Sequence, residues 1–158
     1  MSVVVHIFSG PIHSGKTSAV LNWLDTQSGV FGVLSPTVDG KKVFMNIETK
    51  EIFNMEALPD EPDILSIGKF NFSKGSFDKA IEIIKRGFNK NGWLVIDEIG
   101  PLELKGEGFC SVLKEILSDT SSTQNIMLLV REGMVEMVTD FFGIENFLLV
   151  YIDLSQHS

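Results

Sequence analysis

Eight residues near the start of the chain have the types and spacing that bind phosphate. The stretch Gly10-Pro11-Ile12-His13-Ser14-Gly15-Lys16-Thr17 matches G-x-x-x-x-G-K-S/T, a loop whose backbone N–H groups surround the phosphates of a nucleotide. Its two glycines permit the backbone angles that point these N–H groups at phosphate oxygens. The motif places the Lys16 cation on the β- and γ-phosphates, and the Thr17 hydroxyl can coordinate Mg²⁺. The residues predicted to contact the nucleotide are Gly10, Pro11, Ile12, His13, Ser14, Gly15, Lys16, Thr17 and Ser18.

Two adjacent carboxylates, Asp97 and Glu98, follow the apolar run Trp93-Leu94-Val95-Ile96. A carboxylate at the end of a buried strand is placed to hold Mg²⁺ opposite the phosphate loop, so Asp97 and Thr17 are the predicted metal ligands. Glu98 should point to a different side, where it can orient and partly deprotonate a water that attacks the γ-phosphate. A protein that only binds nucleotide has no need of this second carboxylate. Glu98 therefore favours hydrolysis over simple binding.

Arg131 directly follows another predicted buried strand, residues 126–130. It is placed to neutralise charge that develops on the γ-phosphate, although capping of the strand end or an ion pair with Glu132 would explain it equally. Glu103 is a candidate partner for Arg131 or for a nearby loop through an ion pair. His13 either spaces the phosphate loop or contacts phosphate or a partner. The predicted catalytic residues are Lys16, Glu98 and Arg131.

The elements that must position these residues alternate along the chain. Apolar runs of strand length alternate with helical patterns, which predicts a mostly parallel sheet with helices on both faces. In such a sheet ligands bind beyond the carboxyl ends of the strands, where the loop, the carboxylate pair and Arg131 would all lie. The expected strands are 3–8, 30–35, 93–96, 126–130 and 147–152, and the expected helices are 15–26, 77–88, 109–117 and 134–142.

Residues 36–56 interrupt this alternation. Asp39-Gly40 is a tight-turn dipeptide between apolar stretches, which predicts a short antiparallel insert of two or three strands. The proline-containing segment 58–63 should be a connector, and 64–70 should add one short strand. Ser76 is the expected N-cap of the next helix. The prediction is a single α/β domain over residues 1–158.

Composition and charge exclude several classes of protein. The chain has 158 residues, a net charge of −8 and an isoelectric point near 4.8, which argues against binding nucleic acid through its phosphates. One cysteine, Cys110, excludes an intramolecular disulfide and is expected to be a small core residue. The first apolar run is too short for a membrane helix or signal peptide, so we expect a cytoplasmic protein without membrane contacts.

The stretch Asp97-Glu98-Ile99-Gly100-Pro101-Leu102-Glu103-Leu104, followed by Gly108-Phe109, resembles the D-E-I-G-x-x-E motif of a family of small stand-alone nucleoside triphosphatases. This family is known from archaea, bacteria and the human cancer-related nucleoside triphosphatase. The antiparallel insert and the stretch Gly68-Lys69-Phe70 also resemble the corresponding parts of this family. The family positions that match are Gly10, Gly15, Lys16, Thr17, Asp97, Glu98 and Glu103, and less firmly Arg131.

The resemblance implies a RecA-like P-loop fold in which the strand ending at Arg131 lies between the phosphate-loop strand and the Asp97 strand. It also implies Mg²⁺-dependent hydrolysis of ATP, GTP or other nucleoside triphosphates to diphosphate and phosphate, with broad base tolerance. Two departures concern the loop: His13 stands where the family usually has glycine, and Ser18-Ala19-Val20 replaces a Thr-Leu type of continuation.

Three other functions are compatible with the sequence. A small-molecule kinase would need a pocket for an acceptor hydroxyl, which residues 35–75 could supply. A slow nucleotide switch would act on a partner protein, and a purely structural P-loop fold would bind no nucleotide. The preferred base, the biological pathway, the oligomeric state and the identity of any protein partner do not follow from the residues.

Overall fold

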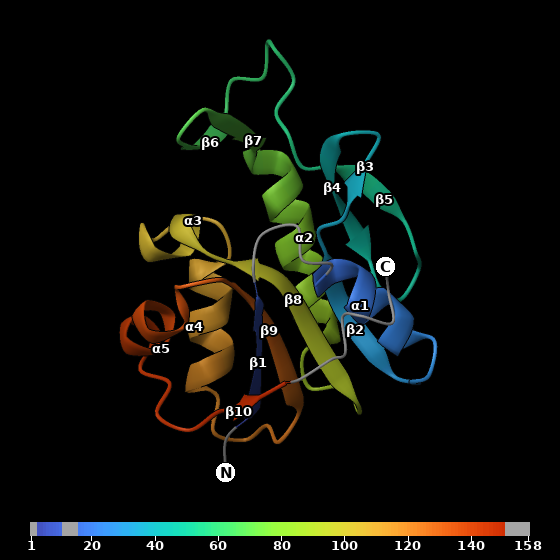
Figure 1. Cartoon of the computed structure of the whole chain (residues 1–158), viewed down its shortest axis with the longest axis vertical. Coiled ribbons are helices and arrows are strands. Elements are labelled where there is room, and N and C mark those ends of the chain that lie inside the picture. Colours follow the sequence, from blue (N-terminus) through green and yellow to red (C-terminus); the bar gives the residue numbers. More distant parts are fainter. Residues whose placement is uncertain (1–2, 11–15, 151–158) are drawn as a thin grey trace.

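A mixed sheet forms the centre of the fold in the computed structural model, which describes residues 3–10 and 16–150 (Figure 1). Its strand order in the described part of the chain is β10-β1-β9-β8-β2-β4-β3, with β5 added on β4. The pairs β10–β1, β1–β9, β9–β8 and β8–β2 are all parallel, as the alternation of strands and helices predicts. The parallel strands are β10 (Leu148–Leu149), β1 (Val4–Gly10), β9 (Asn125–Arg131), β8 (Trp93–Ile99) and β2 (Val30–Leu34).

The antiparallel insert follows β2, as expected. Strand β4 (Lys41–Asn46) runs antiparallel to β2, and both β3 (Thr37–Val38) and β5 (Ile52–Asn54) pair with β4. Asp39 and Gly40 both have positive φ angles, 51° and 77°, at the turn between β3 and β4. Two consecutive residues with positive φ form the hairpin turn that matches the twist of the strands, which explains the Asp-Gly sequence there.

Helices cover both faces of the sheet (Figure 1). Helix α1 (Lys16–Leu24) packs on one face, where Ala19, Val20 and Leu24 meet Phe8, Val95 and Leu129. Helices α2 (Lys74–Gly87), α4 (Cys110–Ser118) and α5 (Val135–Phe142) pack on the other face, over a larger apolar cluster. Strand residues alternate between these two clusters, so each central strand is buried on both sides.

The region between the insert and α2 differs from the prediction. The short strand expected within 64–70 is present as β6 (Ile64–Ile67), but a second strand, β7 (Phe70–Ser73), pairs with it to form a separate two-stranded hairpin at the top of Figure 1. Gly68, with φ of 57°, lies in its turn. The prediction of Ser76 as the N-cap of α2 is wrong. Ser73 caps the helix, and its Oγ accepts a hydrogen bond from the Ser76 N–H. The helix therefore begins where β7 ends.

The chain from β8 to α4 departs from the prediction at two points and agrees with it at Cys110. Strand β8 continues to Ile99, so the prediction that Asp97 and Glu98 follow the strand is wrong, and both lie within it. A short helix, α3 (Pro101–Leu104), occupies the expected turn after Gly100. Cys110 is buried at the start of α4, as predicted. In the described ranges, no helix combines the length and apolar character needed to cross a membrane.

Candidate active site

The strand order brings the predicted site residues to one edge of the sheet. Strand β9 lies between β1 and β8, which confirms the arrangement implied by the family resemblance. In the register of these strands, Gly10 pairs with Arg131, and Asp97 pairs with Leu129. The start of the phosphate loop, Arg131 and the carboxylate pair are therefore neighbours, although their sequence positions span more than 100 residues.

Asp97 is the buried centre of this edge. Only 2% of its surface is exposed, and its Oδ2 accepts hydrogen bonds from the Thr17 hydroxyl at 2.9 Å and from the Ser35 N–H at 3.0 Å. A buried carboxylate needs such donors, and bonds to a charged acceptor are stronger than neutral ones. The two bonds fix the orientation of Asp97. Ser35 was not among the residues predicted for the site, and its position directly after β2 was the available signal.

Thr17 and Asp97 present the oxygen ligands that Mg²⁺ prefers. Neighbouring oxygens in an octahedral shell of radius about 2.1 Å lie roughly 3 Å apart. The 2.9 Å between Thr17 Oγ1 and Asp97 Oδ2 matches that spacing. Among residues 3–10 and 16–150, no group of three or more His, Cys, Asp or Glu side chains is arranged to hold a metal. This site would therefore complete its coordination with phosphate oxygens and water.

Glu98 occupies a β-bulge in β8. Asp97 pairs with Leu129 and Ile99 pairs with the next residue of β9, Val130, so Glu98 is the extra residue. Leu129 belongs to the α1 cluster, whereas Val130 and Ile99 belong to the cluster on the opposite face. The bulge thus allows Ile99 to enter the larger core while half-buried Glu98 stays out of both. Bulges of this kind re-aim side chains next to active sites.

Arg131 ends β9 beside the phosphate loop. Alternation along the strand gives Arg131 the same face as Leu129, which is the α1 face. A Cβ built on Gly100 would lie 3.9 Å from the Cβ of Arg131, so the end of β8 is in contact distance. Among the described residues, no ion pair joins Arg131 to Glu103 or Glu132. Half-buried Arg131 therefore lies at the edge without either of the carboxylate partners considered for it.

Glu103 holds the segment after β8 through hydrogen bonds rather than through the expected ion pair. Its side chain is 2% exposed; Oε1 accepts the Gly100 N–H at 2.7 Å, and Oε2 accepts the Phe109 N–H at 3.0 Å. Burial raises the pKa of Glu103 from 4.5 to about 7. The two backbone bonds lower this pKa, and the nearby Glu98 charge raises it further.

The phosphate loop itself lies largely outside the described residues. The predicted contacts of Pro11, Ile12, His13, Ser14 and Gly15, and that of the Lys16 side chain, fall there and remain predictions. The backbone of Lys16 begins α1, and Ser18 is exposed in its first turn. No acidic residue occurs in that turn, so the positive end of the helix dipole has no carboxylate of its own helix beside it.

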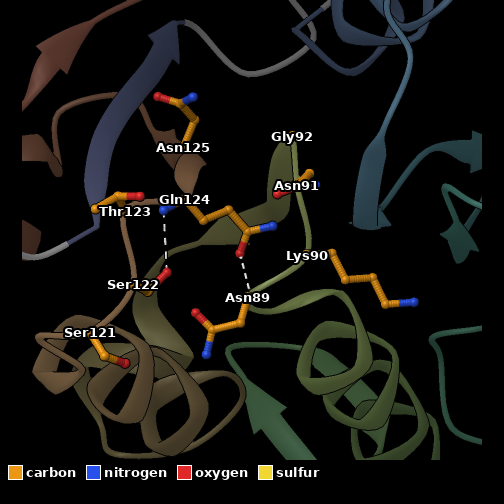
Figure 2. A pocket seen from close by; sticks show the side chains of 9 residues that line it. All are labelled: Asn89, Lys90, Asn91, Gly92, Ser121, Ser122, Thr123, Gln124 and Asn125. Carbon is orange, nitrogen blue, oxygen red and sulfur yellow. Dashed lines mark hydrogen bonds between the residues drawn. The ribbon is translucent and has the colours of Figure 1, made fainter.

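A polar pocket of about 280 Å³ lies away from this edge (Figure 2). The loops 89–92 and 121–125 line it, and these loops lead into the amino ends of β8 and β9. Gln124 is buried there, with Oε1 accepting the Asn89 N–H and Nε2 donating to the Gly87 carbonyl. Because ligands of parallel sheets bind at the carboxyl edge, this pocket is not the predicted nucleotide site.

Comparison with known proteins agrees with this geometry. A family model described as NTPase matches residues 5–153. The crystal structure of THEP1 from the hyperthermophile Aquifex aeolicus aligns with a TM-score of 0.70 at 17% identity, over 95% of this chain and 89% of that chain. The solution structure of a human cancer-related nucleoside triphosphatase aligns with a TM-score of 0.59 at 19% identity, over 94% and 87%. At these identities the two alignments show the fold alone. No curated protein sequence matches the chain.

Proposed function

This chain belongs to the NTPase family, and from that premise we propose that it hydrolyses nucleoside triphosphates to diphosphate and phosphate with Mg²⁺ and with broad base tolerance. The observation that carries the proposal is the bond between Thr17 Oγ1 and Asp97 Oδ2, which joins the two candidate metal ligands at the edge of the sheet. Glu98, the next residue of β8, adds a carboxylate that the metal site itself does not need.

The chemical roles divide among three groups of residues. The loop from Gly10 to Thr17 holds the phosphates through its N–H groups and the Lys16 cation. Thr17 and Asp97 would hold Mg²⁺, which supplies positive charge to the β- and γ-phosphate oxygens when bound. Glu98 orients the attacking water and accepts its proton. The water oxygen forms a bond to the γ-phosphorus as the bond to the β-phosphate oxygen breaks, which releases diphosphate and phosphate.

We assign Arg131 to charge stabilisation in this reaction. Negative charge on the transferring phosphoryl group is stabilised by a nearby guanidinium in several P-loop enzymes. The pairing of Arg131 with Gly10 in adjacent strands supports the assignment, because it puts the arginine beside the first residue of the phosphate loop. The absence of an ion pair with Glu103 or Glu132 among the described residues leaves the guanidinium charge for the phosphate.

Broad base tolerance follows from which part of the nucleotide these groups address. Loop N–H groups, Lys16, Thr17 and Asp97 all act on phosphate or metal, which every nucleoside triphosphate shares. We therefore expect ATP, GTP, CTP and UTP to be hydrolysed at rates within roughly one order of magnitude.

Phosphate release from each of the four triphosphates tests the proposal, with Mg²⁺ or with EDTA and without any added acceptor. We expect release in every Mg²⁺ reaction and none with EDTA. Lys16→Ala is the control for a contaminating phosphatase, because loss of its phosphate contact should abolish binding and release together. Phosphate transfer only when an acceptor alcohol is supplied would overturn hydrolysis in favour of a kinase. A very low rate that rises with a partner protein would instead indicate a switch.

A further inference from the structure

We propose that Glu103 is a positioning residue for Glu98, because its buried carboxylate fixes the backbone that follows the Asp97-Glu98 pair. The inference rests on the proposed role of Glu98 in hydrolysis. Glu103 itself lies on α3 and would touch neither the nucleotide nor the attacking water. Its effect would reach the reaction through the placement of the Glu98 side chain.

The carboxylate of Glu103 joins two segments that are nine residues apart. Oε1 accepts the N–H of Gly100, two residues after Glu98, and Oε2 accepts the N–H of Phe109, directly before α4. Phe109 is 1% exposed and belongs to the larger apolar cluster. The carboxylate therefore connects Gly100, directly after β8, to Phe109 in the larger apolar cluster. A bulged strand loses ladder bonds at the bulge, so this external support acts where β8 is weakest.

The surrounding chain is shaped to admit this carboxylate. Gly108 has a φ of 61°, and a Cβ built there would collide with Glu103 Oε2. Only glycine at 108 lets the carboxylate reach the Phe109 N–H without displacement. The arrangement has a cost, because a carboxylate taken out of water destabilises its charged form. If the N–H groups of Gly100 and Phe109 needed only a hydrogen-bond acceptor, neutral acceptors could satisfy them without that cost.

Glu103 is electrostatically coupled to the residue it positions. The Glu98 charge raises the pKa of Glu103, in addition to the larger effect of burial. Of the other packed elements, β6 has no titratable side chain, and α4 carries the buried Cys110 thiol and two charged residues, Lys114 and Glu115, which are exposed to solvent. Lys105 and Glu107, on the same loop, pair with each other at 3.3 Å, and Lys105 also donates to the Ser66 carbonyl. Protonation of Glu103 would remove one of its two acceptor oxygens and loosen the segment after Glu98.

The test compares Glu103→Gln with the matched control Glu107→Gln, which makes the same change of charge four residues further along. We expect Glu103→Gln to lower kcat about tenfold to a hundredfold with KM changed less than twofold, as for a group misplaced by a fraction of an ångström. The wild-type pH profile of kcat should show an acid limb near pH 7 that disappears in Glu103→Gln. Glu107→Gln should retain both the wild-type kcat and the acid limb.

Three results would overturn the inference. One is a Glu103→Gln protein with wild-type kcat, and another is a loss of kcat that only equals the fraction unfolded by circular dichroism. The third result is measured on the wild-type protein, so this test remains valid even if the Glu103→Gln variant does not fold. Nuclear magnetic resonance of the Gly100 and Phe109 amides should show both titrating with the midpoint of the acid limb, and different midpoints would contradict coupling. A wild-type protein that releases no phosphate would instead refute the proposed function.

Discussion

Thr17 and Asp97, 80 residues apart in the sequence, are joined by a hydrogen bond of 2.9 Å between Oγ1 and Oδ2. The bond connects the first turn of α1 to β8, and the Ser35 N–H supports the same carboxylate oxygen from the end of β2. Three elements of the fold thus hold these two oxygens in place before any ligand arrives. A pre-positioned pair needs little reorganisation to take up Mg²⁺ with a nucleotide.

Thr17→Val should lower the apparent affinity for Mg²⁺ in hydrolysis, because it removes the hydroxyl while keeping the branched shape of the side chain. We expect the Mg²⁺ concentration for half-maximal phosphate release to rise at least about tenfold. Thr26→Val is the control, since Thr26 Oγ1 makes only exposed local bonds after α1: it donates to the Trp23 carbonyl and accepts from Gln27 Nε2. Equal Mg²⁺ titration curves for wild type and Thr17→Val would contradict the assignment of Thr17 as a ligand.

Glu98→Gln should separate binding from turnover. The amide keeps the size of the side chain but cannot accept the proton of the attacking water, so kcat should fall by about 10² to 10⁴. Nucleotide affinity, measured by titration calorimetry with a non-hydrolysable triphosphate and Mg²⁺, should stay within about twofold. Glu132→Gln, an exposed carboxylate after β9, is the matched control. Normal turnover by Glu98→Gln would show that another group activates the water.

Arg131→Met should lower kcat by about 10² or more while leaving diphosphate affinity unchanged, because the guanidinium charge is needed when the γ-phosphoryl group transfers. Methionine retains most of the aliphatic stem of the side chain. Arg86→Met, an exposed change on α2, controls for loss of one positive charge. If Arg131→Met instead weakens triphosphate and diphosphate binding equally and spares kcat, Arg131 acts in binding.

The stability of the protein should fall as pH rises through the titration of Glu103. Its pKa is about 7 in the folded chain and 4.5 as the reference value, so the folded state binds the proton more tightly. The stabilisation is complete below pH 4.5 and is lost as pH approaches 7, a change of about 3 kcal/mol from this residue. Urea unfolding at several pH values should show this loss in wild type and Glu107→Gln but not in Glu103→Gln. A pH-independent difference between wild type and Glu103→Gln would disprove it.

The meeting of Asp97 and Arg131 at one edge of the sheet could be anticipated because it depends on local sequence patterns. Continuous apolar runs such as Leu94–Ile96 specify buried parallel strands, and polar residues that end those runs meet at one edge. Asp97 and Arg131 were found in this way, and the D-E-I-G-x-x-E resemblance supplied the position of β9. Asp39-Gly40 gave the hairpin because its turn type is written in two residues.

The remaining features depend on contacts that no short stretch specifies. The Glu98 bulge arises from the register of β8 against β9, and the bond from Ser35 depends on where β2 ends beside Asp97. The cap of α2 shifted from Ser76 to Ser73 because β7 ends at Ser73, so the helix starts earlier than its apolar pattern. Glu103 was expected to form an ion pair, but the nearest donors are the backbone N–H groups of Gly100 and Phe109.

The bulge in β8 also limits how this chain can vary in length. Deletion of Glu98 would join Asp97 directly to Ile99 and restore regular pairing with β9, but the carboxylate proposed to activate the water would be lost. An insertion on either side would turn Ile99 or Asp97 to the wrong face, because each added residue reverses every side chain beyond it. We therefore expect libraries of single-codon insertions and deletions to lose activity throughout 95–99, while substitutions at Glu98 leave folding intact. Strand β8 therefore tolerates a change of side chain at Glu98 but not a change in its number of residues.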